Sequence, residues 1–287
     1  MGDFSSNGDI LAMMRLTLLI LMVFSLLSCD SRKVTSTKVV KSNGIRIFLL
    51  DSMTCHEDHY RKFKNLTFTK VDDARTFFPC DQKVNERNRM VHAHFVLDSF
   101  LRELNTKIRV EIVSWNVFDG GERSLKRWKQ GLALSSEKNA DIILSASGYS
   151  LSPGENLDDP YPEDIISIFA AGSWGTGLPY GVRLWPQINK TGNMILVGDA
   201  IISSLTSGKG FLYNSSLLNK EKIDFFIPLK RSHKRRFGGS SMAASIFAAR
   251  AINSCHKYLG NKNGFKECIS ENSSELTFVT GQKGRSL

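Results

Sequence analysis

The chain has 287 residues, 41% of them hydrophobic, and a formal net charge of +10. It contains no internal repeats and no segment that resembles a separate binding module, and residues 42–287 are long enough to form one domain with a sizeable core. Part of the positive charge lies in residues 230–236, but the interleaved aromatic residues and recognition motifs of nucleic-acid-binding proteins are absent. Together with the export signal described next, this absence argues against a nucleic-acid partner.

The first 28 residues predict an export signal. Arg15 precedes an apolar run over residues 16–27, which is too short to span a membrane comfortably but has the length of a signal-peptide core. Residues 26–29, Leu-Leu-Ser-Cys, resemble a bacterial lipobox, in which cleavage leaves a lipidated Cys29 at the new N-terminus. An uncleaved anchor helix and an ordinary secretory signal are the alternatives. In each case the chain leaves the cytoplasm.

The acidic and polar residues 1–12 are unusual at the start of a signal peptide, which suggests that translation begins at Met13 or Met14. After Cys29 the chain is polar, basic and without periodicity, so residues 29–43 predict a flexible, lipid-anchored tether. We therefore expect a lipoprotein of the bacterial cell envelope. Its membrane contact is the lipid on Cys29, and its folded domain faces the periplasm or the exterior.

Four cysteines remain when Cys29 carries the lipid: Cys55, Cys80, Cys255 and Cys268. In an oxidising compartment this even number is compatible with two disulfides. The sequence spacing favours Cys55 with Cys80 and Cys255 with Cys268, although four cysteines allow three pairings. No C-x-x-C pair or His/Cys cluster has the spacing of zinc ligands, so we expect no metal and no cofactor.

Residues 44–52 form a short apolar run that ends in an acid, Asp51. A continuous apolar run suits a strand buried in a parallel sheet, and the carboxyl ends of such strands are where open α/β sheets place their active sites. Taken alone, an Asp at the end of a strand also serves as a turn or cap residue. Asp51 is therefore a candidate whose role depends on the rest of the chain.

Residues 90–101 predict a helix, because apolar residues recur there at helical spacing. Two histidines, His92 and His94, lie near its start. Three further strand-like stretches follow this helix: residues 140–148, 165–175 and 193–200.

Residues 238–245, Gly-Gly-Ser-Ser-Met-Ala-Ala-Ser, precede an apolar, Ala-rich run over residues 246–252. This order predicts a tight turn that delivers a hydroxyl to a helix N-terminus, where free backbone N–H groups can stabilise an anion. Ser240 or Ser241 is thus either a nucleophile or only the cap of the helix. The basic residues 230–236, which lie just before the turn, form a solvated loop, a contact for anionic lipid or polymer, or a bias towards acidic substrates.

These stretches resemble, in chain order, motifs of the subtilisin-like serine proteases. The matches are residues 51–53 with D-S/T-G, 92–98 with H-G-T-H-V-A-G, 142–148 with I-N-M-S-L-G-G, 170–175 with A-A-G-N-x-G, 193–199 with N-x-I-x-V-G-A, and 239–245 with G-T-S-M-A-x-P. The order Asp, His, Ser is that of the family's catalytic triad. The resemblance covers roughly residues 44–260. Four departures from the family pattern bear most on the expected activity: Met53 and Ala93 replace glycines, Ser173 replaces Asn, and Ser245 replaces Pro.

The resemblance implies a role for each matched residue. The catalytic triad would be Asp51, His92 and Ser241, with His94 as the competitor of His92. The hydroxyl of Ser173 would contribute to the oxyanion hole. The substrate-binding edge, to which the peptide adds as a strand, would be Ser145, Ala146 and Ser147.

We therefore expect residues 44–287 to form one peptidase domain with a three-layer, subtilisin-like α/β fold, a mainly parallel sheet with helices on both faces. The expected function is that of a monomeric serine endopeptidase that hydrolyses protein or peptide substrates through an acyl-enzyme. The alternative is a weakly active or inactive relative with the same fold, which would serve as a binding or scaffold module of the envelope. Fold alone does not decide between them.

Overall fold

The computed structural model describes residues 44–69, 71, 77–78, 80, 89–119, 121–152, 154–155, 157, 162–172, 183–202, 211–213, 222–229, 238–277 and 283–287. All of them belong to one unit, Lys38–Leu287. The predicted signal peptide, Cys29 with its tether, Ser173 and the basic residues 230–236 lie outside the described residues. Within the described ranges, every helix is too short or too polar to cross a membrane.

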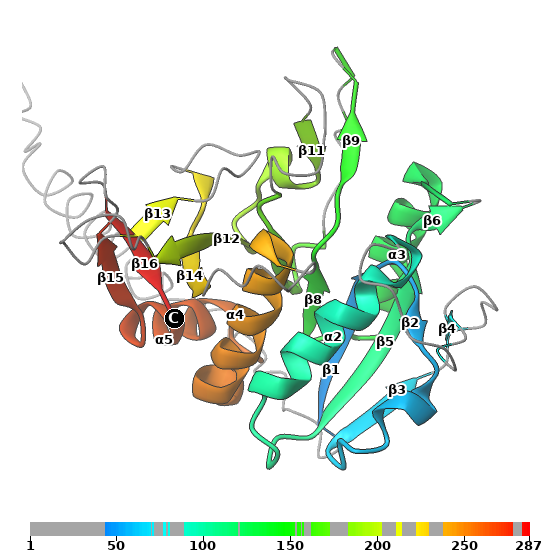
Figure 1. Cartoon of the computed structure of the whole chain (residues 1–287), viewed down its shortest axis with the longest axis horizontal. Helices are drawn as coiled ribbons and strands as arrows, with labels where there is room; N and C mark the ends of the chain where they lie inside the picture. Colours follow the sequence, from blue (N-terminus) through cyan, green and yellow to red (C-terminus); the bar gives the residue numbers. More distant parts are fainter. Residues whose placement is uncertain are drawn as a thin grey trace, which may run out of the picture. The chain divides into compact units, whose positions relative to one another are not determined.

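An eight-stranded sheet lies at the centre of the described residues (Figure 1). Its order is β13-β12-β10-β8-β1-β5-β3, with β14 also paired to β12. Neighbouring strands are parallel except β13, which runs antiparallel to β12. The strands are β1 (Ile45–Asp51), β3 (Leu66–Thr69), β5 (Val110–Asn116), β8 (Ile142–Ser145), β10 (Ile166–Ala170), β12 (Met194–Ile202), β13 (Phe211–Tyr213) and β14 (Phe225–Leu229).

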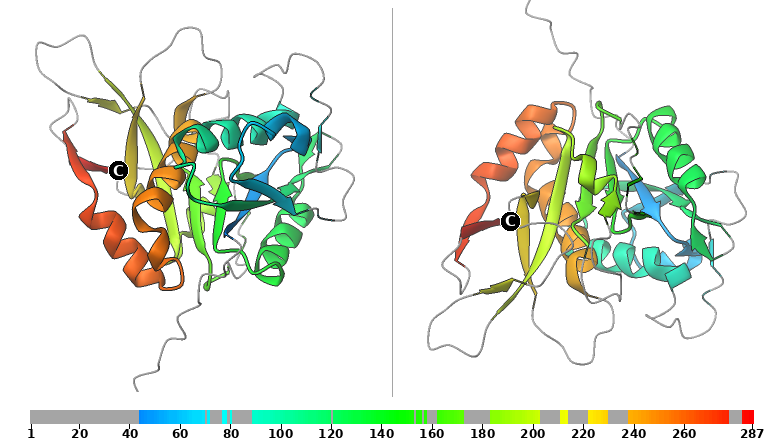
Figure 2. Two further views of the ribbon diagram at one scale, coloured as in Figure 1. Left: turned by 90° about the horizontal axis from the view of Figure 1, so that it is seen from below. Right: turned by 90° about the horizontal axis from the view of Figure 1, so that it is seen from above.

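Helices cover both faces of this sheet. Helices α2 (His92–Glu103), α4 (Gly239–Cys255) and α5 (Lys262–Glu271) contribute to one hydrophobic core, and α3 (Leu125–Glu137) contributes to the other. Figure 2 shows α3 across the sheet from α2. Side chains of β1 alternate between the two cores, with Ile47 and Leu49 in the first and Phe48 and Leu50 in the second. The predicted three-layer α/β fold with a mainly parallel sheet is confirmed.

The parallel pairing of β1 with β5 and β8 places the carboxyl ends of these strands at one edge of the sheet. In β1 the pairing with β5 runs from Ile45↔Val110 to Asp51↔Asn116, and on the other side Leu49 pairs with Leu144 of β8. Because β1 and β8 are parallel, Asp51 and the residues that follow Leu144 lie at the same edge of the sheet. This edge also receives the first turns of α2 and α4, which pack against each other.

Short elements and two disulfides complete the described structure. The additional strands are β2 (Thr54–Cys55), β4 (Phe77–Phe78), β6 (Phe118–Asp119), β7 (Glu122–Arg123), β9 (Tyr149–Leu151), β11 (Arg183–Trp185), β15 (Ser274–Thr277) and β16 (Lys283–Ser286). The 3₁₀ helices are η1 (Glu57–Tyr60), η2 (Arg89–Val91), η4 (Gln187–Asn189) and η6 (His256–Tyr258). The disulfides join Cys55 to Cys80 and Cys255 to Cys268, the pairing that the sequence spacing favours.

Candidate active site

Asp51 and His92 form a hydrogen-bonded pair at the carboxyl edge of the sheet. Asp51 is the last residue of β1 and is only 1% exposed, whereas His92 is the first residue of α2 and its side chain is 28% exposed. The His92 Nδ1–H donates to Asp51 Oδ1 over 2.9 Å. The buried carboxylate therefore fixes the imidazole through Nδ1, and His92 is the more accessible member of the pair.

The surroundings of Asp51 favour its ionised form. Burial alone would raise the pKa of this carboxyl, but the neighbouring groups, His92 foremost among them, together outweigh burial and lower the pKa below its ordinary value. The Ser52 N–H, which donates to Asp51 Oδ1 over 2.7 Å, and the charge of Arg123 lower the pKa further. Asp51 is thus a carboxylate held in a pocket of positive potential.

Ser52 ties the end of β1 to the start of α2. Its side-chain oxygen accepts a hydrogen bond from the Ala93 N–H over 2.9 Å, and the Met53 N–H donates to the Met90 carbonyl over 3.0 Å. No side chain of the N-cap residue, Val91, caps α2. Ser52 therefore satisfies one of the backbone donors that the helix start leaves open, and it fixes His92 relative to Asp51.

Ser241 reaches the same edge from α4 and meets the pair through Ala146. The Ser241 hydroxyl donates to the Ala146 carbonyl over 3.3 Å, and the Ala146 N–H donates to Asp51 Oδ2 over 3.3 Å. Ala146, the residue that follows β8, thus contacts both the Asp51 carboxylate and the Ser241 hydroxyl. The structure brings Asp51, His92 and Ser241, which are far apart in the sequence, to one site.

The start of α4 distinguishes the two adjacent serines. Gly239, with φ of 66°, adopts the left-handed conformation that glycine takes at little cost, and α4 begins there. The helix phase buries Ser240, which is 2% exposed, while Ser241 is only partly buried. Ser241 is therefore the serine of this pair that remains accessible.

His94 lies in a different environment from His92. It is 7% exposed, and a hydrogen bond of 2.7 Å joins its Nδ1 to the Tyr60 hydroxyl. Burial, followed by the charge of His59, lowers the pKa of His94 to about 4. The geometry thus pairs His92, not His94, with the carboxylate.

The predicted substrate edge is less open than the sequence implies. Ser145 is fully buried and its hydroxyl donates to the Leu50 carbonyl, while Ser147 is 6% exposed. Behind them, Gln187 Nε2 donates to the carbonyls of Ser147 (3.1 Å) and Ala170 (3.2 Å) and so joins the ends of β8 and β10. Of the three predicted residues, Ala146 has the more accessible side chain.

Ser245, which stands where the family pattern has Pro, is fully buried and donates its hydroxyl to the Met242 carbonyl over 2.8 Å. The hydroxyl therefore has a partner inside the first turns of α4, and its burial leaves no unsatisfied donor. Ala93, which replaces a glycine, is also fully buried, so the helix start accommodates its methyl group.

Sequence reasoning missed two residues that support Asp51. Ser52 could have been found, because it occupies the second position of the matched Asp motif. Arg123, on the short β7 strand, gave no signal, since a single Arg in an irregular stretch has no recognisable pattern. Ser173 lies outside the described residues, so its predicted oxyanion contact stays a prediction.

Comparison with known proteins gives similarity in structure but not in sequence. No family model and no curated relative matches the chain. Among solved structures, a cold-adapted subtilisin-like serine proteinase aligns with a TM-score of 0.57 at 15% identity, over 85% of this chain and 88% of its own. A lanthipeptide protease aligns with a TM-score of 0.51 at 14% identity, over 79% of each chain. A structure of subtilase cytotoxin assembly aligns with a TM-score of 0.50 at 13% identity, over 86% of this chain and 87% of its own. The chain therefore has the fold of the subtilisin-like serine proteases.

Proposed function

We propose that the protein is a serine endopeptidase in which Ser241 is the nucleophile, His92 the general base and Asp51 the residue that orients His92. The observation that carries this proposal is the hydrogen bond between His92 and the buried Asp51, with the hydroxyl of the partly exposed Ser241 linked to the same carboxylate through Ala146. A shared fold alone would not support an activity, because proteins with one fold can have unrelated functions. The arrangement of these side chains adds the chemistry.

In the proposed reaction the Ser241 hydroxyl turns from the Ala146 carbonyl towards Nε2 of His92. His92 accepts the hydroxyl proton as Ser241 Oγ attacks the carbonyl carbon of the peptide bond, and it then donates that proton to the leaving amine. The Asp51 carboxylate keeps the proton of His92 on Nδ1 and stabilises the imidazolium that forms. Water then releases the acyl group from Ser241 by the same steps in reverse order.

The oxyanion would be held at the start of α4. No side chain caps this helix at Gly238, so its first backbone N–H groups are available to a developing negative charge. The second donor in this proposal is the Ser173 hydroxyl. Each such donor contributes about 10²–10³-fold to the rate, a magnitude measured in subtilisin itself.

A fluorophosphonate probe, which phosphonylates activated serines, tests the proposal directly. We expect the purified protein to be labelled, and the Ser241→Ala and His92→Ala variants to lose labelling. Ser240→Ala is the matched control, because Ser240 is the adjacent, buried serine of the same turn. Absence of labelling in a wild-type protein shown to be folded by circular dichroism would contradict the proposal and leave a protein with this fold that only binds peptides.

A further inference from the structure

A second cluster of reactive side chains lies near the start of α2, on the side of His94. Cys55, His59 and His94 each offer one metal-ligand atom, and these atoms all lie within 4.8 Å of one another. Cys55 and His94 are buried, whereas His59 is exposed. The described residues contain no other group of three such side chains at this separation.

The spacing of the three atoms is close to what a tetrahedral ion requires. Zinc binds thiolate sulfur and imidazole nitrogen at about 2.0–2.3 Å, so its ligand atoms stand about 3.3–3.8 Å apart. The largest separation in the cluster, up to 4.8 Å, therefore has to contract by about 1–1.5 Å to meet these distances. Thiolate and imidazole together are also the donor set that zinc prefers.

Neighbouring contacts hold the two imidazoles in place. Tyr60 binds His94 Nδ1 over 2.7 Å, and the His59 ring meets the His94 ring edge-on with centroids 4.8 Å apart. Hydrogen bonds of this kind to a ligating His fix the orientation of its ring. Both histidines also line an open cavity of about 470 Å³, which gives an ion a path from solvent.

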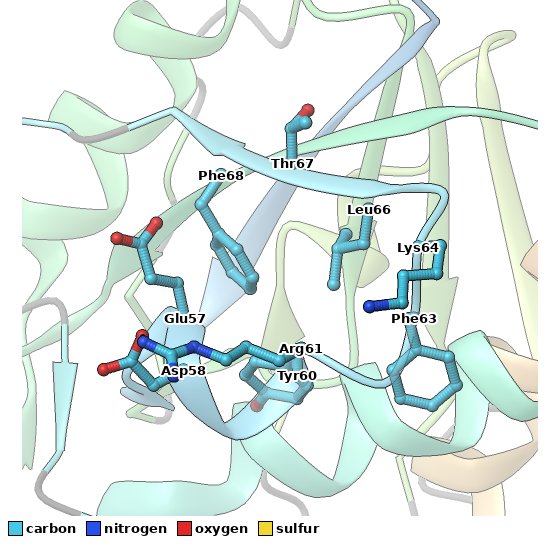
Figure 3. A pocket seen from close by; sticks show the side chains of 9 residues that line it. All are labelled: Glu57, Asp58, Tyr60, Arg61, Phe63, Lys64, Leu66, Thr67 and Phe68. Carbon is cyan, nitrogen blue, oxygen red and sulfur yellow. The ribbon is translucent and has the colours of Figure 1, made fainter.

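A second cavity, lined in part by η1 and β3, differs in its lining (Figure 3). It also has a volume of about 470 Å³, but its lining contains no His or Cys. One of its carboxylates, Asp58, is already paired with Arg61 over 2.7 Å. The two histidines of the cluster therefore line only one of the two cavities.

The Cys55–Cys80 disulfide closes the cluster to metal, because a sulfur in a disulfide is not a thiolate. We propose that reduction of this disulfide creates a zinc site formed by the Cys55 thiolate, His59 and His94, with one coordination position open to water. This site goes beyond the proposed peptidase function and does not depend on it. A dithiol supplies the two electrons and two protons that convert the disulfide into the Cys55 and Cys80 thiols, and it becomes a disulfide itself. The Cys55 thiol then releases its proton to solvent when its sulfur binds zinc.

Two single variants test the site without any reductant. Both Cys80→Ser and Cys55→Ser break the same disulfide, but only Cys80→Ser leaves the thiol that lies beside the two histidines. Under anaerobic conditions, competition with a chromogenic chelator should show one zinc per chain in Cys80→Ser. Its affinity should exceed that of Cys55→Ser by about 100-fold, the share of one ligand in the binding energy of structural zinc sites.

Cobalt provides a second readout. Cys80→Ser loaded with Co²⁺ should show a thiolate-to-cobalt charge-transfer band in the near ultraviolet, and Cys55→Ser should lack it. Adding His59→Gln to Cys80→Ser should weaken zinc binding by about 100-fold for the same reason. Equal zinc affinity in the two cysteine variants, or in the oxidised wild-type protein, would overturn the proposal.

If loss of the disulfide unfolds the domain, zinc itself becomes the probe. Binding that is confined to the folded state adds to its stability, so zinc should restore the far-ultraviolet circular dichroism of Cys80→Ser and not that of Cys55→Ser. Failure of zinc to discriminate between the two unfolded variants would also overturn the proposal.

Discussion

The two faces of the sheet are filled in different ways. The core under α2 and α4 contains many small residues, and α4 alone buries five alanines: Ala243, Ala244, Ala248, Ala249 and Ala251. The core under α3 contains large aromatic residues, among them Trp115, Trp128, Trp185 and Phe169. Small side chains let helix backbones approach each other and the sheet closely, whereas large ones fill space at a distance. The face packed with small residues is the one whose helices carry His92 and Ser241.

The largest effect should follow from Asp51→Asn, which keeps the shape of the buried side chain but removes its charge. An amide can donate to His92 Nδ1 and so place the imidazole proton on the wrong nitrogen. Loss of this orienting group in a Ser-His-Asp triad lowers kcat by about 10⁴-fold. The measurement is the rate of fluorophosphonate labelling. Asp98→Asn, which lies on the same helix as His92 and is paired with Arg102, should keep the wild-type rate, and similar rates in the two variants would contradict the assigned role of Asp51.

A substitution in the aromatic core under α3 should have the opposite effect. It should lower the stability of the protein and leave its labelling rate unchanged. Trp128 is fully buried, and its ring lies 6.4 Å from Phe169 and 6.0 Å from Trp185. Trp128→Ala should lower the free energy of unfolding by about 3–5 kcal/mol. Denaturant titration measures this loss, and the labelling rate per folded molecule should be unchanged. A slower rate in the folded fraction would show that the α3 face also positions the site.

Overpacking provides a matched test of the two faces. Ala244→Leu inserts volume at a fully buried position one turn after Ser241, and it should cost about 1–3 kcal/mol and slow labelling as α4 is displaced. Gly131→Ala on α3 brings a methyl group within 2.4 Å of Leu50 Cδ1 and 2.6 Å of Trp115 Cδ1. It should cost about 1–2 kcal/mol, because the better helix propensity of Ala offsets part of the strain, and it should leave labelling unchanged. If Ala244→Leu and Gly131→Ala slow labelling equally, labelling does not depend specifically on the close packing of α4 against the sheet.

The smallest effect should be a pH dependence of stability. The pKa of Asp51 is lower in the folded state than in the unfolded state, where it lies at about 3.9. The resulting stabilisation is therefore fully present above about pH 4, and it is lost as the pH falls through the folded-state pKa. Chemical denaturation of the wild type and of Asp51→Asn should show a difference in unfolding free energy that decreases between about pH 5 and pH 2. A difference that grows towards acid would mean that the sign of this linkage is wrong.

The sequence was informative wherever one local pattern determined the structure. The apolar run that ends in Asp51 predicted a buried parallel strand, and the Gly-Gly-Ser-Ser stretch predicted a helix start, because both follow from local backbone and burial preferences. The structure begins this helix at Gly239 with Gly238 as its N-cap, so neither Ser240 nor Ser241 is the cap. The preference for His92 over His94 came from family resemblance. The physical difference depends on Tyr60, a residue more than thirty positions away whose hydroxyl binds His94. Arg123 beside Asp51 could not be foreseen either, since long-range proximity leaves no trace in a single sequence.

The link between Ser241, Ala146 and Asp51 also bears on when the protein can act. These groups come from widely separated parts of the chain, and such non-local contacts form late because the intervening loops must first be closed at an entropic cost. Because α4 ends at Cys255, most of the chain must leave the ribosome before α4 can fold and place the Ser241 hydroxyl near Asp51. In the proposed reaction, a partly synthesised chain would have the acid and the base but no nucleophile, so the proposed hydrolysis would start only once folding of the domain is nearly complete.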